Sequence, residues 1–265
     1  NLAMYRIISK RKKLDFGYTS SVKESLDRLS SKWRIDQHVY DLHLGKRDDV
    51  VDTAINVNGV IFHIPTLSKD SLYVLWNCLW PECHNCCDRQ GRLPLTVDDI
   101  NTIAKKLGYD SKNKFIKNET VISSWQEHEP FGNIITTLSM LSLKRKVDER
   151  EQDDGTPISC RFLDEKGYCG IHPNKPGVCW LYPFASWLES DNRGRAVVHA
   201  TFQLTGDCPG FYVSPSLDDM MPILKEYSMK IYDYNMATSR TTREGYGVIN
   251  MVDLKKDYSG KIQEK

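Results

Sequence analysis

The eight cysteines of this chain fall into two groups, with none outside them. One group is the segment Cys78-Leu-Trp-Pro-Glu-Cys83-His-Asn-Cys86-Cys87, and the other consists of Cys160, Cys169, Cys179 and Cys208. Thiolates two to four residues apart can converge on one soft cation, and ligands from distant segments close a site that the unfolded chain lacks. The pattern predicts that all eight cysteines are metal ligands and that metal binding is coupled to folding.

Disulfides, a thiol redox centre and inert buried thiols are the alternatives. The chain has 265 residues, residues 1–13 lack the apolar stretch of a secretory signal, and Cys86 and Cys87 are adjacent. Adjacent cysteines rarely bridge each other, and disulfide frameworks belong mainly to small secreted domains. Cys83-His-Asn-Cys86 has the CxxC spacing of a redox centre, but no βαβ pattern precedes it. Metal ligation is therefore favoured.

Composition narrows the classes of partner. The 36 basic residues nearly cancel the 35 acidic ones, and 40% of the residues are hydrophobic, as in an ordinary globular protein. With so small a net charge, the protein as a whole has no electrostatic attraction to nucleic acid. No apolar run reaches the roughly 18 residues of a membrane span. We expect a cytoplasmic protein without a transmembrane segment or nucleic-acid partner. A protein partner or protein substrate, and a targeting segment preceding Asn1, stay open.

Periodicity predicts short helices and strands joined by long loops. Helical spacing of apolar residues favours helices over residues 20–33, 95–108 and 220–236, the second of them capped by Thr96 and ended by Gly108. Residues 53–64 predict a hairpin around Asn58-Gly59, and residues 134–143 and 196–204 are strand-like. We expect a charged loop over residues 144–157 and an extended or mobile tail from Thr238.

The fold class that these elements predict is α+β, a small, loop-rich body organised around the cysteine site. Ligand segments more than seventy residues apart must meet in such a fold. We expect an N-terminal subdomain of helix and hairpin over residues 1–70, a cysteine-cluster domain over residues 71–215, and a C-terminal helix and tail over residues 216–265.

The order of the cysteine segments resembles the YkgJ-like (CxxCxCC) family of zinc- or iron-chelating domains. In that family a double cysteine is followed by a capped helix and then by C-x-F-L, G-x-C-x-I and R-P-x-x-C-R-x-Y-P-F segments. The matching positions here are Cys83, Cys86, Cys87, residues 95–108, Cys160, Cys169, Cys179, Tyr182-Pro183-Phe184 and Cys208-Pro209-Gly210. The resemblance covers residues 75–212 and implies a metal-binding function.

Three positions depart from the family pattern. Four residues separate Cys78 from Cys83 where the family usually has two, so whether Cys78 belongs to the same site stays open. Lys175 and Trp180 stand where the family favours arginine, so no role of those guanidinium groups carries over.

The identity of the metal stays open between zinc and iron. Eight thiolates suit two tetrahedral zinc sites, whereas an iron–sulfur cluster spreads its ligands more widely and tolerates the adjacent Cys86 and Cys87 better. The chain also resembles, more distantly, the flagellin lysine N-methylase family, which implies a [4Fe–4S] cluster and redox or methyl-transfer chemistry. We therefore favour iron, with a zinc-stapled, non-catalytic interaction module as the alternative.

Several other residues could enter the site, each with a simpler explanation. His84, His172 and His199 are available as ligands, although single histidines are more often structural. Tyr182 and Phe184 are expected to pack around the site and not to contact substrate. The sequence contains no glycine-rich phosphate loop, GxSxG or HExxH motif, so it assigns no catalytic residue.

Overall fold

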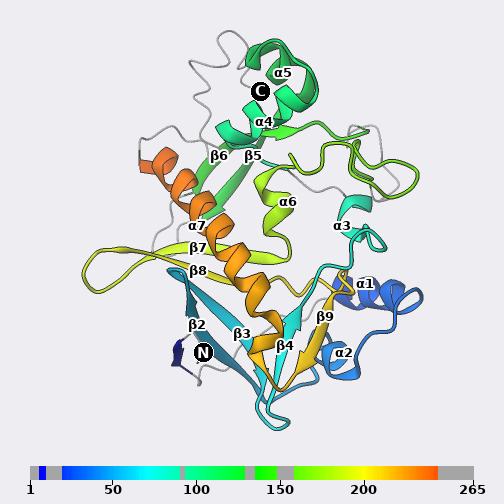
Figure 1. Ribbon diagram of the computed structural model, residues 1–265, viewed down its shortest axis with the longest axis vertical. Helices are drawn as coiled ribbons and strands as arrows, with labels where there is room; N and C mark the ends of the chain where they lie inside the picture. Colours follow the sequence, from blue (N-terminus) through cyan, green and yellow to red (C-terminus); the bar gives the residue numbers. More distant parts are fainter. Residues whose placement is uncertain (1–5, 10–19, 90–92, 129–134, 148–157, 244–265) are drawn as a thin grey trace. The chain divides into compact units, whose positions relative to one another are not determined.

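The computed structural model describes residues 6–9, 20–89, 93–128, 135–147 and 158–243 of the chain (Figure 1). The chain forms two compact units. Unit 1 comprises Asn1–Cys86 and Leu181–Asn235, and unit 2 comprises Cys87–Trp180 and Met236–Lys265. In sequence, most of unit 2 is therefore an insertion between two stretches of unit 1. Both units mix helices, strands and long loops, which confirms the predicted α+β class.

Unit 1 is built on a curled seven-stranded sheet. Five strands follow one another in antiparallel order: β1 (Arg6–Ser9), β2 (Val50–Val57), β3 (Val60–Leu67), β4 (Leu72–Trp76) and β9 (Phe211–Ser214). The strand β8 (Ala196–Phe202) pairs in parallel with the first half of β3, and β7 (Phe184–Ser190) pairs with β8 in antiparallel register. The two chain stretches of unit 1 thus interleave in a single sheet.

The predicted hairpin joins β2 to β3. Val57 pairs with Val60, which leaves Asn58 and Gly59 as the two turn residues, with φ angles of 51° and 86°. Two consecutive positive φ angles are typical of the turn that matches the twist of a β-hairpin, and Asn-Gly is the pair that adopts it most easily.

Helices and a short 3-10 turn accompany the sheet in the described part of unit 1. They are α1 (Ser20–Ser30), α2 (Gln37–His43), η1 (Leu217–Met220) and α7 (Met221–Arg243), whose first fifteen residues belong to this unit. The helix α7 buries Leu224 and Ile231, and its Asn235 side chain donates a hydrogen bond to Ser186 Oγ on β7 at 2.8 Å.

The helix predicted for residues 20–33 is confirmed as α1, although it ends at Ser30. The expected tail from Thr238 is wrong for its first residues, because α7 continues to Arg243. The remainder, residues 244–265, lies outside the described residues.

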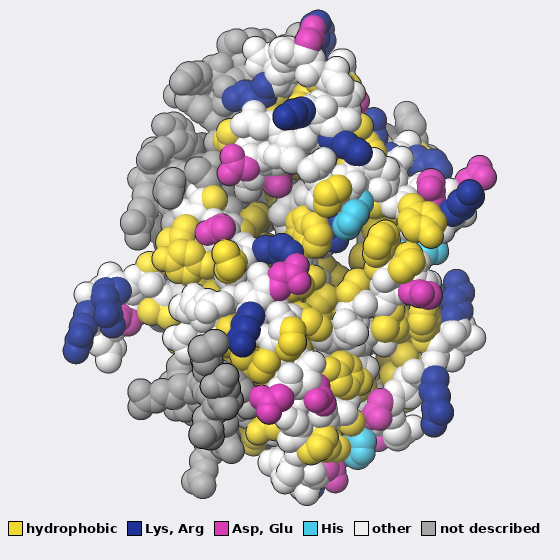
Figure 2. All heavy atoms as spheres, in the orientation of Figure 1, with side chains coloured by type: hydrophobic (Ala, Val, Ile, Leu, Met, Phe, Trp, Pro, Cys, Tyr) yellow, Lys and Arg dark blue, Asp and Glu magenta, His cyan; other side chains and the backbone are white. Residues whose placement is uncertain are grey.

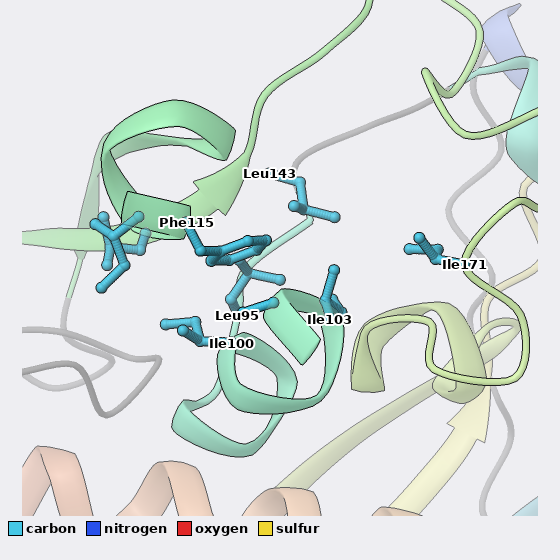
Figure 3. Packing of buried hydrophobic residues seen from close by; sticks show 9 residues of the cluster. Leu95, Ile100, Ile103, Phe115, Leu143 and Ile171 are labelled. Atoms are coloured by element: carbon cyan, nitrogen blue, oxygen red, sulfur yellow. The ribbon is translucent and has the colours of Figure 1, made fainter. Parts of the chain in front are cut away.

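Unit 2 has its own hydrophobic core between two helices and a hairpin. The helix α4 (Val97–Lys106) begins with a reciprocal capping box in which Thr96 and Asp99 accept from each other's backbone N–H, as predicted. Phe115 of α5 (Lys112–Glu119) packs with Ile100 and Ile103 of α4 (Figure 3). The strands β5 (Thr120–His128) and β6 (Ile135–Leu143) pair along their full length and confirm the strand predicted for residues 134–143.

Two short helices carry three of the eight cysteines. The helix α3 (Asn85–Asp88) carries Cys86 and Cys87, and α6 (Gly177–Leu181) carries Cys179. Of the predicted loop over residues 144–157, residues 144–147 are irregular as expected, and the rest lies outside the described residues.

On the visible face of the molecule, basic and acidic side chains are interspersed, in keeping with the net charge of +1 (Figure 2).

Candidate metal centre

The eight cysteines divide equally between the two units. Unit 1 holds Cys78, Cys83, Cys86 and Cys208, and unit 2 holds Cys87, Cys160, Cys169 and Cys179. All eight lie within the described residues, and no disulfide joins any of them. Each set combines the first cysteine group of the sequence with the second. Below, these sets are called the unit 1 tetrad and the unit 2 tetrad.

The end of β4 brings Cys208 to the first cysteine group. Beyond the Trp76–Phe211 pair, the Asn77 N–H donates to the Gly210 carbonyl at 2.9 Å, so the ladder with β9 continues into the Cys208 loop. The indole Nε1–H of Trp76 donates to Cys208 Sγ at 3.3 Å. The loop that carries Cys208 is thus fixed next to the strand end that leads to Cys78.

Gly210 permits this close approach. A Cβ atom added at this position would lie 2.1 Å from the Asn77 carbonyl oxygen and 3.0 Å from Trp76 Nε1. No side chain fits in that space, because real Cβ contacts below 3.0 Å essentially do not occur. The glycine after Cys208-Pro209 therefore has a steric role in holding the Cys208 loop against Asn77.

A second hydrogen bond ties the Cys208 loop to the turn that carries Cys83 and Cys86. The Asn85 side-chain amide donates to the Asp207 carbonyl at 3.0 Å, one residue before Cys208. The Cys83 N–H donates to the Leu79 carbonyl at 3.0 Å, which closes the turn between Cys78 and Cys83. Asn85 thus links the first cysteine group to the second within unit 1.

Thiols of the unit 1 tetrad influence the pKa values of Cys208 and Tyr182. The pKa of Cys208 is raised to about 12, mainly by burial and to a smaller extent by the Cys83 and Cys78 thiols, against hydrogen bonds from Gly210 and Trp76. Burial also raises the pKa of Tyr182, with Cys208 and Cys86 among the further causes. Bound to a proton, the Cys208 thiol is neutral, and a metal ion would replace that proton.

Backbone contacts organise three cysteines of unit 2. The Cys160 N–H donates to the Cys87 carbonyl at 2.6 Å, so the two segments that carry these cysteines lie side by side. Leu163 and Cys169 form an isolated antiparallel bridge, and the Gly170 N–H donates to the Phe162 carbonyl at 2.7 Å. Burial raises the pKa of Cys160, and the Cys169 thiol contributes to the rise.

The carboxylate of Asp99 positions the segment that carries Cys179. Its Oδ2 accepts from the Thr96 N–H at 2.9 Å within the capping box, and its Oδ1 accepts from the Gly177 N–H, also at 2.9 Å. Because Gly177 is the first residue of α6, one side chain holds the starts of both α4 and α6. Burial raises the pKa of Asp99, against these hydrogen bonds.

Side chains around the tetrads were only partly predictable. Trp76, Asn85 and Asp99 were not foreseen as parts of the site, although the capping box that contains Asp99 was. Lys175 and Trp180, which replace the arginines of the family pattern, form a cation–π pair with the ammonium 4.0 Å from the ring centre. Phe184 is buried and packs on Trp76, as expected for a packing residue.

The residues fit a thiolate-bound metal by their donor chemistry. Within the described parts of the chain, no three Cys, His, Asp or Glu side chains already stand close enough together to hold a metal ion. Closing a four-thiolate site in either unit therefore requires local side-chain and loop adjustment upon binding, as the coupling of metal binding to folding implies. Of the candidate histidines, His199 is hydrogen-bonded to His63, which lies on the neighbouring strand β3.

Cysteines gathered from distant segments into compact units define a metal-chelating, cysteine-rich domain. Residues 77–202 match the CxxCxxCC family, described as "Putative zinc- or iron-chelating domain". The match agrees with the cysteine-cluster family that the sequence pattern predicted, and it supports metal binding by the cysteines. Cys208 follows the matched segment by six residues. No curated protein and no solved structure matches the chain.

Membrane insertion through a helix finds no support in the described residues. None of their helices combines the length and the apolar character that crossing a bilayer requires.

Proposed function

We propose that the chain is an iron–sulfur protein in which the unit 1 tetrad and the unit 2 tetrad each ligate one cluster. The observation that carries the proposal is the equal division of the cysteines, four in each compact unit. Four thiolates are the ligand number of a cubane [4Fe–4S] cluster and also of a structural zinc site.

The division accounts for the adjacent cysteines. Neighbouring side chains point apart, so Cys86 and Cys87 reach a single small ion only with distortion. In the proposed arrangement Cys86 ligates the cluster of unit 1 and Cys87 ligates the cluster of unit 2. Because their side chains point apart, the two residues can reach two different sites. In this arrangement Cys78 would be the fourth ligand of the unit 1 tetrad.

The surroundings of Cys208 support iron. Trp76 and Phe184 are buried, and their rings and that of Tyr227 contact one another at centroid distances of 5.3 to 5.9 Å. A dry aromatic shell and an N–H···S hydrogen bond such as that from Trp76 are the means by which proteins set the reduction potential of a cluster. The Cys208-Pro209 pair is also typical of the end of a cluster-binding run.

An iron–sulfur cluster would supply one-electron redox chemistry. The protein's own contribution is to exclude water with the aromatic shell and to hold Cys208 through Trp76 and Asn85. The resemblance of the Cys160-x-Phe-Leu-Asp164 and Cys179-x-x-Tyr-Pro183 segments to the flagellin lysine N-methylases extends the proposal to methyl transfer onto a protein substrate.

Zinc is the second candidate, and one observation favours it. Since Cys86 and Cys87 lie in different units, the adjacency that argued against a small ion no longer does so. Two zinc ions would then staple the two units of a non-catalytic interaction module, and their removal would unfold the units, because structural zinc supplies on the order of 10 kcal/mol.

The test is metal and sulfide analysis of protein purified without oxygen. The iron–sulfur proposal predicts brown protein with roughly eight irons and eight sulfides per chain, the content of two cubane clusters. Colourless protein with about two zinc ions establishes the second candidate instead. A protein that binds neither metal overturns both.

A further inference from the structure

A second group of polar side chains crosses the sheet of unit 1. His63 on β3, His199 on β8 and Trp187 on β7 lie on one face, and Trp187 is the register partner of His199. The alternate residues Phe62 and Val198 are fully buried on the opposite face. The polar face is only half-buried, with 20% of the His63 side chain and 15% of the His199 side chain exposed. These residues are reachable from solvent, although they lie in the middle of strands.

The side chains of Asp52, His63 and His199 form a hydrogen-bonded chain, here called the relay. Asp52 Oδ2 on β2 lies 2.6 Å from His63 Nδ1, and His63 Nε2 lies 2.9 Å from His199 Nδ1. The two imidazole planes are inclined by only 19°, so the rings meet edge to edge in a nearly common plane. Asp52 is 4% exposed, and its other oxygen, Oδ1, has no hydrogen-bond partner among the described residues.

Hydrogen-bonding rules fix the direction of the relay. The ionised Asp52 carboxylate can only accept, so His63 Nδ1 carries the proton and His63 Nε2 is left as an acceptor. The His199 Nδ1–H then donates to His63 Nε2, and the lone pair of the relay emerges on His199 Nε2. A buried carboxylate behind a histidine is the arrangement that orients an imidazole and stabilises its protonated form.

The free end of the relay faces a polar and aromatic edge. Glu189 Oε2 lies 3.5 Å from His199 Nε2, and Glu189 Oε1 accepts from the Trp187 indole N–H at 2.8 Å. An ionised carboxylate and an imidazole lone pair both accept, so a group that donates a proton satisfies the two together. The Trp187 ring lies within 13° of the His199 plane and is 37% exposed, which offers a flat surface beside that end.

We propose that His199 Nε2 is the proton acceptor of a second functional site, which binds a planar aromatic ligand beside Trp187 and takes a proton from its O–H or N–H group. The ligand's O–H or N–H bond breaks and an N–H bond forms on His199. The electron pair stays on the ligand, and the imidazolium charge is balanced through His63 by Asp52. The reverse transfer returns the proton, and no oxidant or reductant is required.

The charges around His199 support this role. Burial lowers the pKa of His199, and His63 lowers it further, whereas Glu189 and Asp52 raise it. Asp52 lies on β2, His63 on β3 and Glu189 on β7, so each of these three strands contributes one residue that shifts the pKa of His199. A neutral imidazole at neutral pH keeps its lone pair available for general-base work.

The probe is 4-nitrophenol, a planar phenol whose anion absorbs at longer wavelength than the neutral form. At a pH below the pKa of the free probe, adding the full-length protein should increase the anion absorbance in a saturable manner. His199→Gln should abolish the increase and Asp52→Asn should weaken it, because the neutral amide cannot balance the imidazolium. Trp187→Leu should weaken binding. His38→Gln, on the exposed part of α2, is the matched control and should behave as the wild type.

Two readouts keep the inference falsifiable. If Asp52→Asn does not fold, His63→Gln interrupts the same relay and should give the same loss. Nitrogen chemical shifts should show His199 protonated at Nδ1 and bare at Nε2. No anion signal with the wild type, or an equal signal with folded His199→Gln, overturns the inference. Because the relay contains no cysteine, the variants should keep the metal content of the wild type, so this inference and the proposed metal function fail separately.

Discussion

Cys86 and Cys87 share a peptide bond and nevertheless belong to different compact units of the molecule, because the division between unit 1 and unit 2 falls between them. Their neighbours extend the contrast. Asn85 bonds to the Asp207 carbonyl of unit 1, and the Cys87 carbonyl accepts from Cys160 of unit 2. In the proposed assignment, one turn of helix therefore supplies consecutive residues to two different ligand sets.

The first prediction concerns metal content. Cys86→Ser and Cys87→Ser should each lose about half of the bound metal, because each removes one ligand from a different tetrad. Cys86→Ser combined with Cys208→Ser should lose no more than Cys86→Ser alone, whereas Cys86→Ser combined with Cys87→Ser should lose nearly all. Elemental analysis measures this pattern. Complete loss of metal from either single variant would show that one shared site is present instead.

The second prediction concerns Gly210. Gly210→Ala should lower the free energy of unfolding by about 2 to 4 kcal/mol, because the added Cβ collides with the Asn77 carbonyl and pushes the Cys208 loop from β4. Urea denaturation measures the change. Gly170→Ala is the control, since its Cβ would lie at an ordinary 3.4 Å from the Phe162 carbonyl. Equal midpoints for the two variants would contradict the steric role of Gly210.

The third prediction concerns acid stability. His43 is buried, its Nδ1 donates to the Val39 carbonyl at 2.8 Å, and its Nε2 has no hydrogen-bond partner in the described part of the chain. Burial lowers the pKa of His43, so the unfolded state binds the proton more readily. The stability linked to this residue is complete above the unfolded pKa of about 6.5 and is lost as the pH falls below it.

His43→Leu should therefore resist acid better than the wild type over that interval. Thermal melting between neutral and mildly acidic pH measures the difference. His38→Leu, on the exposed part of the same helix, is the control and should track the wild type. Parallel melting curves for wild type and His43→Leu at all pH values would refute the assignment.

The fourth prediction concerns Asp99. Asp99→Ala should cost about 1 to 2 kcal/mol more than Thr96→Ala, because it removes the two hydrogen bonds that the Asp99 carboxylate accepts from the Thr96 and Gly177 N–H groups. Thr96→Ala removes only the hydrogen bond from the Asp99 N–H to the Thr96 hydroxyl. Asp98→Ala, an exposed change in the same helical turn, should be close to neutral. Unfolding by urea ranks the three variants. A cost for Asp99→Ala no larger than that for Thr96→Ala would exclude a separate contribution from α6.

Most of the secondary structure could be predicted from local sequence signals. Asn58-Gly59 specified a two-residue hairpin turn, and Thr96 with Asp99 specified the start of α4, because turn and cap chemistry acts over a few residues. The end of α7 was missed because Thr238, Ser239 and the pair Thr241-Thr242 are weak helix formers. The helix nevertheless continues to Arg243. The family resemblance, which depends on cysteine order, was confirmed by the match over residues 77–202.

Long-range relationships could not be predicted in this way. The pairing of β3 with β8 joins residues 136 apart, as His63 and His199 show, and no local pattern encodes it. The role of Trp76 depends on the same kind of contact, because its indole meets Cys208 only through the β4–β9 pair. The predicted subdomain over residues 1–70 remains a prediction.

Because unit 2 is inserted into unit 1 in the sequence, the ribosome translates most of unit 2 before the second stretch of unit 1. When the ribosome has produced β1 to β4, the strands β8 and β9 that complete their sheet are still more than a hundred residues away. Unit 2 emerges in the meantime with nearly all of its own core. The first half of unit 1 therefore has an unpaired sheet edge until β8 and β9 are translated, and under the proposed assignment Cys78, Cys83 and Cys86 lack their fourth ligand until Cys208 is translated.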